Sequence, residues 1–198
     1  NEKVLEERHN LLSIKKNLNK NKTLSNDDQK FVKYLSVKYL VEYKNKHKID
    51  TINELLIKVD IIPNSIVLAQ AANESGWGSS RFAQEYNALF GEYTYNVDDG
   101  VIPAKRDEGK KHLIKYFSSL DKSIESYFIN INTHQAYIEF RNSRNKQRKS
   151  NNDFNVYLLV KKLDVYAEDD KYVDTLNSII KVNNFPKYDD IKLLTTNL

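Results

Sequence analysis

The sequence predicts an α+β, mainly α fold with a small antiparallel β-lobe. Apolar residues recur at helical spacing through most of the 198 residues, whereas residues 93–117 change to an alternating pattern broken by turn signals. All five glycines fall between Gly76 and Gly109, which concentrates the backbone conformations that need glycine in the same region. By its length the chain is one compact unit with enough mass to bury a core.

The first part of the chain, residues 1–60, is predicted to be a helical extension that packs on a catalytic core formed by residues 61–198. Packing is favoured over the alternative role of an arm that reaches a partner chain. The spacing of apolar residues predicts three helices in the extension: Val4 to Leu18, Phe31 to Val41 after a polar start at residues 26–28, and Thr51 to Val59.

The next predicted helix carries the best candidate for a catalytic residue. Pro63 suits a first turn, small and apolar residues follow almost all round the helix, and Gly76 is typical of a left-handed stop. Glu74 therefore lies in the last turn, where the helix dipole disfavours a carboxylate, and Trp77 is expected to add an apolar wall. Both effects favour the protonated form that a general acid needs. The competing interpretation is a solvated glutamate beside an ordinary glycine cap.

Beyond this helix the expected elements change type and then return to helices. A short helix capped by Ser79 and Ser80 is predicted to run to Tyr86. Alternation and turn signals predict the β-lobe at Tyr93 and Tyr95, Asp99-Gly100, Glu108-Gly109, and Leu113 to Phe117. Four helices are then expected at Leu120 to Ile131, Tyr137 to Gln147, Phe154 to Leu163, and Tyr172 to Ile180. The tail from Asn183 is polar and is expected to be loosely ordered.

Composition excludes several classes of function. Cysteine is absent, so thiolate catalysis and disulfides are excluded, and the four histidines are widely separated, so we expect no metal and no cofactor. No phosphate-binding glycine loop, serine triad or dinucleotide fingerprint is present. No apolar run is long enough to span a membrane. Methionine is also absent, so we expect a processed or truncated chain from which a signal peptide or anchor has been removed.

The formal net charge is +4, and the basic residues form two clusters, Lys15 to Lys22 and Arg141 to Lys149. Such runs are usually solvated faces, and we predict that role here. The alternative is attraction to an anionic polymer such as a bacterial wall. No nucleic-acid-binding motif accompanies the basic runs, so we expect no nucleic-acid partner.

At residues 59–90 the sequence VDIIPNSIVLAQAANESGWGSSRFAQEYNALF resembles the Bax-like branch of bacterial glucosaminidase domains. These are flagellar-hydrolase-like peptidoglycan hydrolases of glycoside hydrolase family 73. The similarity continues in NTHQAY at 132–137, FR at 140–141 and YAEDDKY at 166–172, so it covers roughly residues 50 to 182. The ESG triplet alone is shared with lytic transglycosylases, whereas ESGWG followed by an NxLFG run is fairly specific.

The resemblance implies a lysozyme-like fold whose β-lobe overhangs a substrate cleft. It implies hydrolysis of the β-1,4 bond after N-acetylglucosamine in peptidoglycan glycan strands, with Glu74 as general acid. Tyr166, in a connector between two helices, matches the family tyrosine that faces the catalytic glutamate; the alternative is a tyrosine that packs at a helix end. The residues it implies for substrate binding are Trp77, Asn87, Phe90 and Tyr93. We expect a monomer acting in the bacterial cell envelope or after secretion.

The second catalytic carboxylate is left open by the sequence. Five acidic residues lie in or near the β-lobe, and none stands in a motif that marks a base: Glu92, Asp98, Asp99, Asp107 and Glu108. Inverting, retaining and substrate-assisted mechanisms therefore all stay open. Two other functions compete with the glucosaminidase: a lytic transglycosylase or muramidase on the same polymer, and a non-catalytic wall-binding module.

Overall fold

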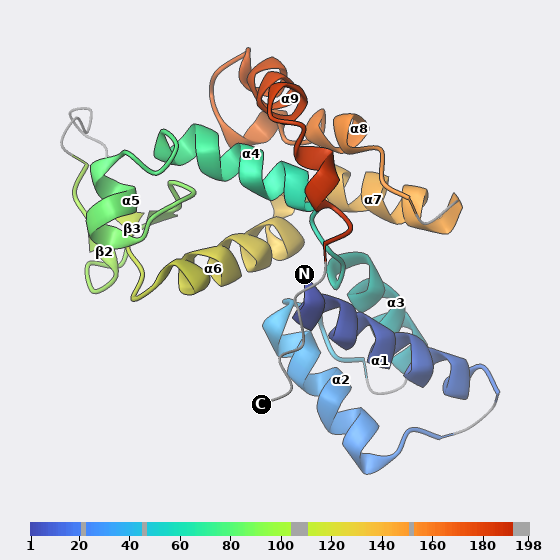
Figure 1. The fold of residues 1–198 in the computed structure, drawn as a ribbon. Helices are drawn as coiled ribbons and strands as arrows, with labels where there is room; N and C mark the ends of the chain where they lie inside the picture. The colour runs from blue at the N-terminus through green and yellow to red at the C-terminus, as the bar shows by residue number, and fades with distance from the viewer. Residues whose placement is uncertain (21–22, 45–46, 104–110, 151–152, 192–198) are drawn as a thin grey trace, which may run out of the picture.

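The computed structural model describes residues 1–20, 23–44, 47–103, 111–150 and 153–191. The α-helices are α1 Glu2–Leu18, α2 Asn26–Lys38, α3 Lys48–Lys58, α4 Asn64–Ser75, α5 Arg81–Tyr86, α6 Leu120–Thr133, α7 Ile138–Ser150, α8 Val156–Val160 and α9 Tyr172–Val182. Three short 3-10 helices are η1 Gln135–Tyr137, η2 Asp164–Tyr166 and η3 Phe185–Tyr188, and the strands are β1 Tyr93–Thr94, β2 Gly100–Val101 and β3 Leu113–Lys115. The predicted α+β, mainly α fold class is confirmed (Figure 1).

Helix α4 lies in the middle of the molecule, where it packs against α9 and η3 (Figure 1). Its small residues allow this close packing, and Ile66, Ala69 and Gln70 are all 0% exposed. The helix ends as predicted: Gly76 has φ 57°, in the left-handed region. The next residue, Trp77, closes the end by donating its backbone N–H to the Ala72 carbonyl at 2.8 Å.

The three N-terminal helices lie together at one end of the molecule (Figure 1). Helix α3 contacts both α1 and α2, and on its other side it contacts α7. The apolar residues that predicted these helices face one another; Leu11, Leu35 and Leu55, one from each helix, are all 0% exposed. Helix α3 thus connects the N-terminal helices to the rest of the fold.

The second basic run is not the solvated face that its charge predicts. Lys146 and Lys149 are exposed, but Arg141 and Arg144 are buried, at 3% and 0% exposure. Arg144 donates to four backbone carbonyls between residues 57 and 61, at 2.9 to 3.4 Å, where α3 ends. The last carbonyls of a helix lack intrahelical partners, so a buried guanidinium is stabilised there. The prediction of a solvated face is therefore wrong for these two arginines.

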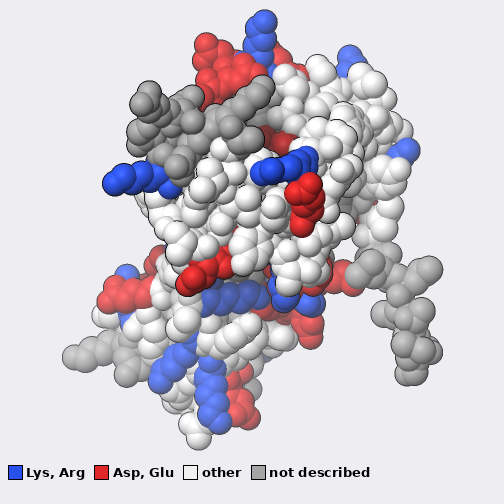
Figure 2. Space-filling view, turned by 90° about the vertical axis from the view of Figure 1, so that its left-hand side faces the viewer, with Lys and Arg blue, Asp and Glu red and all other residues white. Residues whose placement is uncertain are grey.

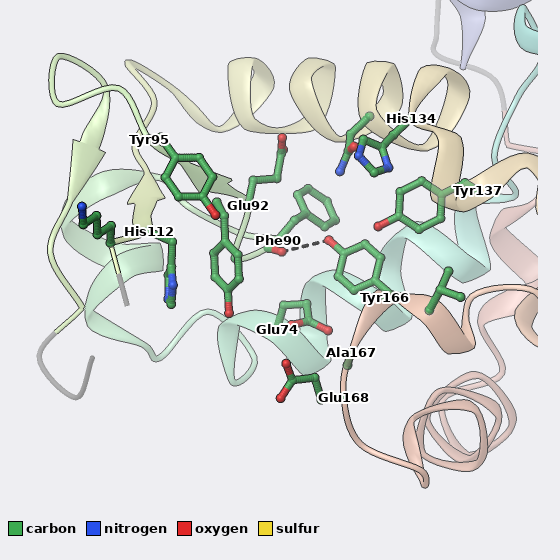
Figure 3. Close-up of a pocket in the computed structure, with 15 residues that line it drawn as sticks. Glu74, Phe90, Glu92, Tyr95, His112, His134, Tyr137, Tyr166, Ala167 and Glu168 are labelled. Atoms are coloured by element: carbon green, nitrogen blue, oxygen red, sulfur yellow. Dashed lines mark hydrogen bonds between the residues drawn. The ribbon is translucent and has the colours of Figure 1, made fainter. Parts of the chain in front are cut away.

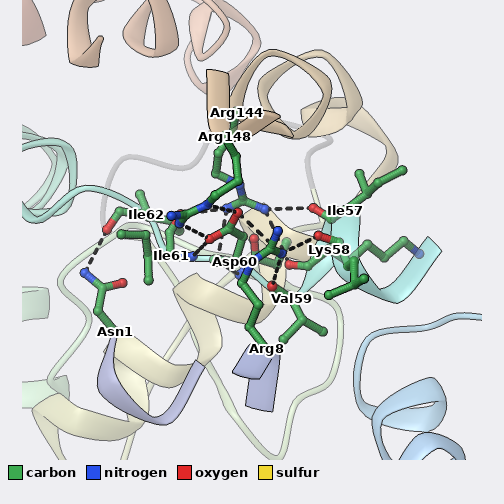
Figure 4. Close-up of polar contacts among 12 residues, drawn as sticks. Asn1, Arg8, Ile57, Lys58, Val59, Asp60, Ile61, Ile62, Arg144 and Arg148 are labelled. Carbon is green, nitrogen blue, oxygen red and sulfur yellow. Dashed lines mark hydrogen bonds and ion pairs between the residues drawn. The ribbon is translucent and has the colours of Figure 1, made fainter. Parts of the chain in front are cut away.

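Asp60 is the centre of a buried ionic cluster (Figure 4). Its side chain is 2% exposed, lies 3.5 Å from Nη1 of Arg8 on α1, and accepts a hydrogen bond from Nε of Arg148 on α7 at 3.0 Å. Arg8 also donates to the carbonyl of Val59 at 2.9 Å. Burial lowers the pKa of Arg144 to about 10, so this guanidinium stays charged at neutral pH. The cluster therefore ties α1 and α7 to the end of α3.

The β-lobe is a three-stranded antiparallel sheet with strand order β1-β3-β2. Tyr93 pairs with Ile114, and Gly100 pairs with Lys115. A Cβ atom at Gly100 would lie 2.6 Å from the side chain of Leu113, so the sheet needs glycine there. The turn predicted at Glu108-Gly109 lies outside the described residues.

Two expectations for the C-terminal part need correction. The helix expected from Phe154 to Leu163 is shorter, with α8 spanning only Val156–Val160. The tail, expected to be loosely ordered, is packed as far as it is described. It forms η3, and Asp189 accepts hydrogen bonds from the backbone N–H and the hydroxyl of Ser65 at 2.7 and 2.9 Å. The backbone N–H of Ser65 lies at the start of α4 and has no partner within the helix, so Asp189 satisfies it. The composition of the tail alone does not predict this contact.

The face shown in Figure 2 carries basic and acidic side chains interspersed, with wide uncharged areas between them. No helix within the described ranges is long and apolar enough to cross a membrane.

Candidate active site

Three consecutive residues with positive φ follow Glu74 and turn the chain sharply. Gly76, Trp77 and Gly78 have φ of 57°, 58° and 76°. Ser75 fixes this turn, since its hydroxyl donates to the Ala71 carbonyl at 2.5 Å and accepts from the Gly78 N–H at 2.7 Å. A left-handed tryptophan is strained, so the surrounding hydrogen bonds must hold it. The turn leaves Glu74 at the C-terminal end of α4, facing a cleft.

The cleft has a volume of about 860 Å³ and is bounded by α4, the β-lobe, α6 and the segment around η2 (Figure 3). Glu74 lies on one side of it, and Glu92 comes from the segment that leads into β1. The other lining residues are Phe90, Gly91, Tyr93, Tyr95, Lys111, His112, Asn130, His134, Tyr137, Val165, Tyr166, Ala167 and Glu168. The cleft thus combines carboxyl groups with aromatic rings.

The environment of Glu74 favours its protonated form. Burial raises the pKa of the Glu74 carboxyl above its ordinary value of 4.5, while hydrogen bonds from Asn73 and Tyr172 act in the opposite direction. The direction is the one predicted, but the cause differs, because Trp77 does not line the cleft. Phe90 and Tyr166 provide the apolar surroundings instead (Figure 3). A carboxyl that holds its proton toward neutral pH can act as a general acid.

Glu92 is the carboxyl that sequence reasoning did not single out. One oxygen, Oε2, accepts a hydrogen bond from the Ser126 hydroxyl at 2.9 Å, and Lys115 donates to Ser126 at 3.1 Å. The other oxygen, Oε1, is buried without a hydrogen-bond partner among the described residues. Burial raises the pKa of Glu92, against the lowering effects of Ser126 and Lys115. Its position directly after the NALFG run is the one sequence signal that favours it.

The other acidic candidates do not join Glu74 and Glu92. Asp98 and Asp99 lie in the β-lobe but do not line the cleft, and Asp107 and Glu108 lie outside the described residues. Within the described ranges, no group of three or more histidine, cysteine, aspartate or glutamate side chains could hold a metal ion.

Tyr166 lies in the cleft with its ring between two other tyrosines. The ring stacks on Tyr172 at 5.8 Å between centroids and lies 6.0 Å from Tyr137. Its hydroxyl donates to the backbone carbonyl of Phe90 at 2.9 Å (Figure 3). Burial raises the pKa of the Tyr166 phenol well above its ordinary value, so the hydroxyl stays neutral and can donate.

The four residues expected to bind substrate divide into two pairs. Phe90 and Tyr93 line the cleft. Tyr93 is 66% exposed and stacks on His112 at 4.2 Å between ring centroids. Trp77 and Asn87 lie outside the lining. Trp77 is 63% exposed beside Phe185, and Asn87 donates its side-chain amide to the Phe117 carbonyl at 3.0 Å.

A mainly helical domain whose cleft carries two half-buried carboxyl groups and exposed aromatic rings has the features of carbohydrate-cleaving domains. The family model described as "Glucosaminidase: Mannosyl-glycoprotein endo-beta-N-acetylglucosaminidase" matches residues 49–185. The chain therefore belongs to the glucosaminidase family.

Two relatives support the Bax-like assignment. The chain is 36% identical over 136 residues to Protein bax of Escherichia coli strain K12, a match that covers 69% of this chain and 48% of that protein. It is 25% identical over 138 residues to Exo-glucosaminidase LytG of Bacillus subtilis strain 168, covering 68% of this chain and 48% of that protein. The chain thus spans about half the length of these curated relatives. No solved structure matches it, so the lysozyme-like fold stays a prediction.

Proposed function

We propose that this chain is a peptidoglycan hydrolase, an endo-β-N-acetylglucosaminidase that cleaves the β-1,4 bond after N-acetylglucosamine. The observation that carries the proposal is Glu74, a half-buried carboxyl without a cationic hydrogen-bond partner in the described residues, facing the cleft of a glucosaminidase-family domain. The family description supports cleavage at N-acetylglucosamine and the endo mode, and the relative named an exo-glucosaminidase supports the glucosaminidase class.

In this proposal Glu74 is the general acid. Its carboxyl gives a proton to the glycosidic oxygen as the bond from that oxygen to the anomeric carbon breaks. The raised pKa keeps the proton available toward neutral pH. The carboxylate left behind accepts a hydrogen bond from Tyr172, which stabilises it once the proton has gone.

Glu92 is the proposed base. A water molecule attacks the anomeric carbon, its hydroxyl stays on the sugar, and its proton passes to the Glu92 carboxylate. Proton exchange with solvent then returns Glu74 to its acid form and Glu92 to its carboxylate. Ser126 holds Oε2 in place, and Ser126 and Lys115 favour the carboxylate form that a base needs, against the opposing effect of burial. Participation by the acetamido group of the substrate is the competing route, and it would need no base at this position.

The aromatic side chains are proposed to hold the sugar rings. Tyr93 and Tyr95, at 66% and 78% exposure, present rings on the β-lobe side, and Phe90 and Tyr137 lie deeper in the cleft. Sugar faces stack on such rings because both surfaces are apolar. Trp77 and Asn87 lie outside the lining, so we leave them out of the proposed substrate-binding set.

The partner implied by this function is the glycan strand of peptidoglycan, met in the bacterial cell envelope or after secretion. A monomer suffices, because the proposed acid, base and aromatic walls all come from one chain. Residues 1–60 are proposed to be a helical extension that stabilises residues 61–198, through contacts such as the hydrogen bond from Arg148 to Asp60.

The test is mass spectrometry of muropeptides after digestion of purified peptidoglycan. We expect products with N-acetylglucosamine at the reducing end. Glu74→Gln keeps the shape of the side chain but removes the transferable proton, so turnover should fall by roughly two to four orders of magnitude while binding to the polymer persists. Glu85→Gln, at an exposed glutamate on α5, is the matched control and should digest at the parental rate.

Each other product pattern contradicts the proposal in a different way. Anhydromuramic ends would indicate a lytic transglycosylase, reducing-end muramic acid a muramidase, and binding without products a wall-binding module. Normal digestion by a folded Glu74→Gln protein would remove Glu74 from the mechanism. Normal digestion by Glu92→Gln would remove the proposed base and favour acetamido participation.

A further inference from the structure

Gln70 is a fully buried polar residue that does not line the cleft. It lies on α4 one helical turn before Glu74, and its side chain is 0% exposed. Its amide joins two tyrosines from other helices. The Tyr127 hydroxyl, from α6, donates to Oε1 of Gln70 at 2.5 Å, and Nε2 of Gln70 donates to the Tyr172 hydroxyl oxygen, from α9, at 2.9 Å.

The chemistry of the amide fixes the direction of both hydrogen bonds. An amide oxygen only accepts and an amide nitrogen only donates, so Tyr127 must give its proton and Tyr172 must receive one. With the amide reversed, the Tyr127 proton would face the NH₂ group of Gln70 in a site that is 0% exposed, where an unmatched donor is costly. When Oε1 of Gln70 accepts from Tyr127, Nε2 of Gln70 must therefore donate to the Tyr172 hydroxyl oxygen and occupy one of its acceptor positions.

Tyr172 is thereby left with one free proton, and the Glu74 carboxyl is the acceptor available to it: hydrogen bonding between the two acts to raise the pKa of the Tyr172 phenol and to lower that of the Glu74 carboxyl. Tyr172 is only 2% exposed, so water does not compete for this proton. A hydrogen bond donated to a carboxylate stabilises the charged form. Asn73 donates a second hydrogen bond to Glu74, from Nδ2 to Oε1 at 3.2 Å.

We propose that Gln70 is a positioning residue that acts on Glu74 through Tyr172. By occupying the acceptor side of the Tyr172 hydroxyl, it makes Tyr172 a donor to Glu74, so the Glu74 carboxylate is stabilised after it gives up its proton. This inference deepens the proposed function and rests on the role of Glu74 in it.

Other titratable groups face Glu74 and must be held constant in a test. Phenols approach from three further elements, α6, η1 and η2, and charged or titratable side chains line the same cleft. They are Tyr127, Tyr137, Tyr166, Glu92, Lys111, His112, His134 and Glu168. The variants below leave all of them unchanged.

The experiment is a carboxyl ¹³C NMR titration of Glu74 without substrate, in the parent, Tyr172→Phe, Gln70→Met and the double variant. Tyr172→Phe should raise the titration midpoint, because the carboxylate loses a donor. Gln70→Met should raise it by a smaller amount, because Tyr172 is no longer held as a donor. In the double variant Gln70→Met should add no further shift, and the basic limb of the pH profile of kcat/KM should move in the same pattern.

Tyr39→Phe is the matched control, since Tyr39 is another buried tyrosine whose hydroxyl donates to a glutamate, Glu7, at 2.6 Å. It should lower stability and leave the Glu74 midpoint unchanged. An unchanged midpoint in Tyr172→Phe would overturn the proposal. So would a Gln70→Met variant that only lowers Tm, or one whose shift persists in full beside Tyr172→Phe.

If Gln70→Met fails to fold, Tyr172→Phe, which removes a single oxygen, still decides whether the donor exists. Because the titration needs no substrate, it can contradict the role of Gln70 whether or not the protein has glycosidase activity. The digestion assay tests that activity separately.

Discussion

Asp60 is a fully buried carboxyl group and Glu74 a half-buried one, and the groups around them differ in charge. Asp60 lies among the guanidinium groups of Arg8 and Arg148 (Figure 4). The groups that donate to Glu74 are neutral, the amide of Asn73 and the hydroxyl of Tyr172. A carboxyl whose hydrogen-bond donors are neutral and which is partly shielded from water, like Glu74, can keep a proton.

Burial of an acidic side chain therefore does not by itself identify a catalytic residue. At Asp60 the carboxylate compensates arginines that cap the carbonyls at the end of α3, and it does not line the cleft. Glu74 is only half-buried, its donors are neutral, and it borders a cleft of about 860 Å³. We therefore propose that the first arrangement serves stability and the second serves proton transfer.

The comparison predicts its largest effect on stability at Asp60. Asp60→Ala leaves buried guanidinium groups without their carboxylate, so the free energy of unfolding should fall by about 3 to 5 kcal/mol. Glu139→Ala removes an exposed carboxylate from α7 and should change it by no more than about 0.5 kcal/mol. Urea unfolding of both variants measures the difference. Equal unfolding free energies for the two variants would show that the cluster does not hold the fold together.

A smaller effect, on activity, is predicted at Tyr166. Tyr166→Phe keeps the ring but removes the hydrogen bond to the Phe90 carbonyl, which fixes the wall opposite Glu74. The loss should cost about 1 to 3 kcal/mol in kcat/KM on peptidoglycan. If Tyr166→Phe digests peptidoglycan at the parental rate and Tyr166→Ala only lowers Tm, Tyr166 has a packing role and is not a residue of the active site.

Local chemistry explains what could be predicted from the sequence. The end of α4 and the place of Glu74 follow from Gly76, whose left-handed conformation is a property of a few neighbouring residues. Arg144 was mispredicted because the carbonyl of Asp60 that it meets lies 84 positions away. The Gln70–Tyr172 bond spans 102 positions, and no spacing rule connects residues at such distances.

The smallest predicted effect is a pH dependence of stability. Because burial raises the pKa of Glu74 in the folded state, the folded protein binds a proton at Glu74 more tightly than the unfolded chain does. The stability this contributes is present below pH 4.5 and is lost as the pH rises through the folded pKa. Glu74→Gln cannot titrate, so its Tm relative to the parent should rise between pH 4 and pH 7. A constant Tm difference across this range would contradict the raised pKa.

The most direct measurement is the pKa of Glu74 in the folded parent protein. Carboxyl ¹³C NMR of glutamate-labelled protein gives the titration, and the resonance missing from Glu74→Gln assigns it. The account predicts a midpoint above the ordinary glutamate value of 4.5. A midpoint at or below 4.5 would mean that Glu74 is ionised like a solvated carboxylate, and the contrast with Asp60 would no longer explain how this cleft acts.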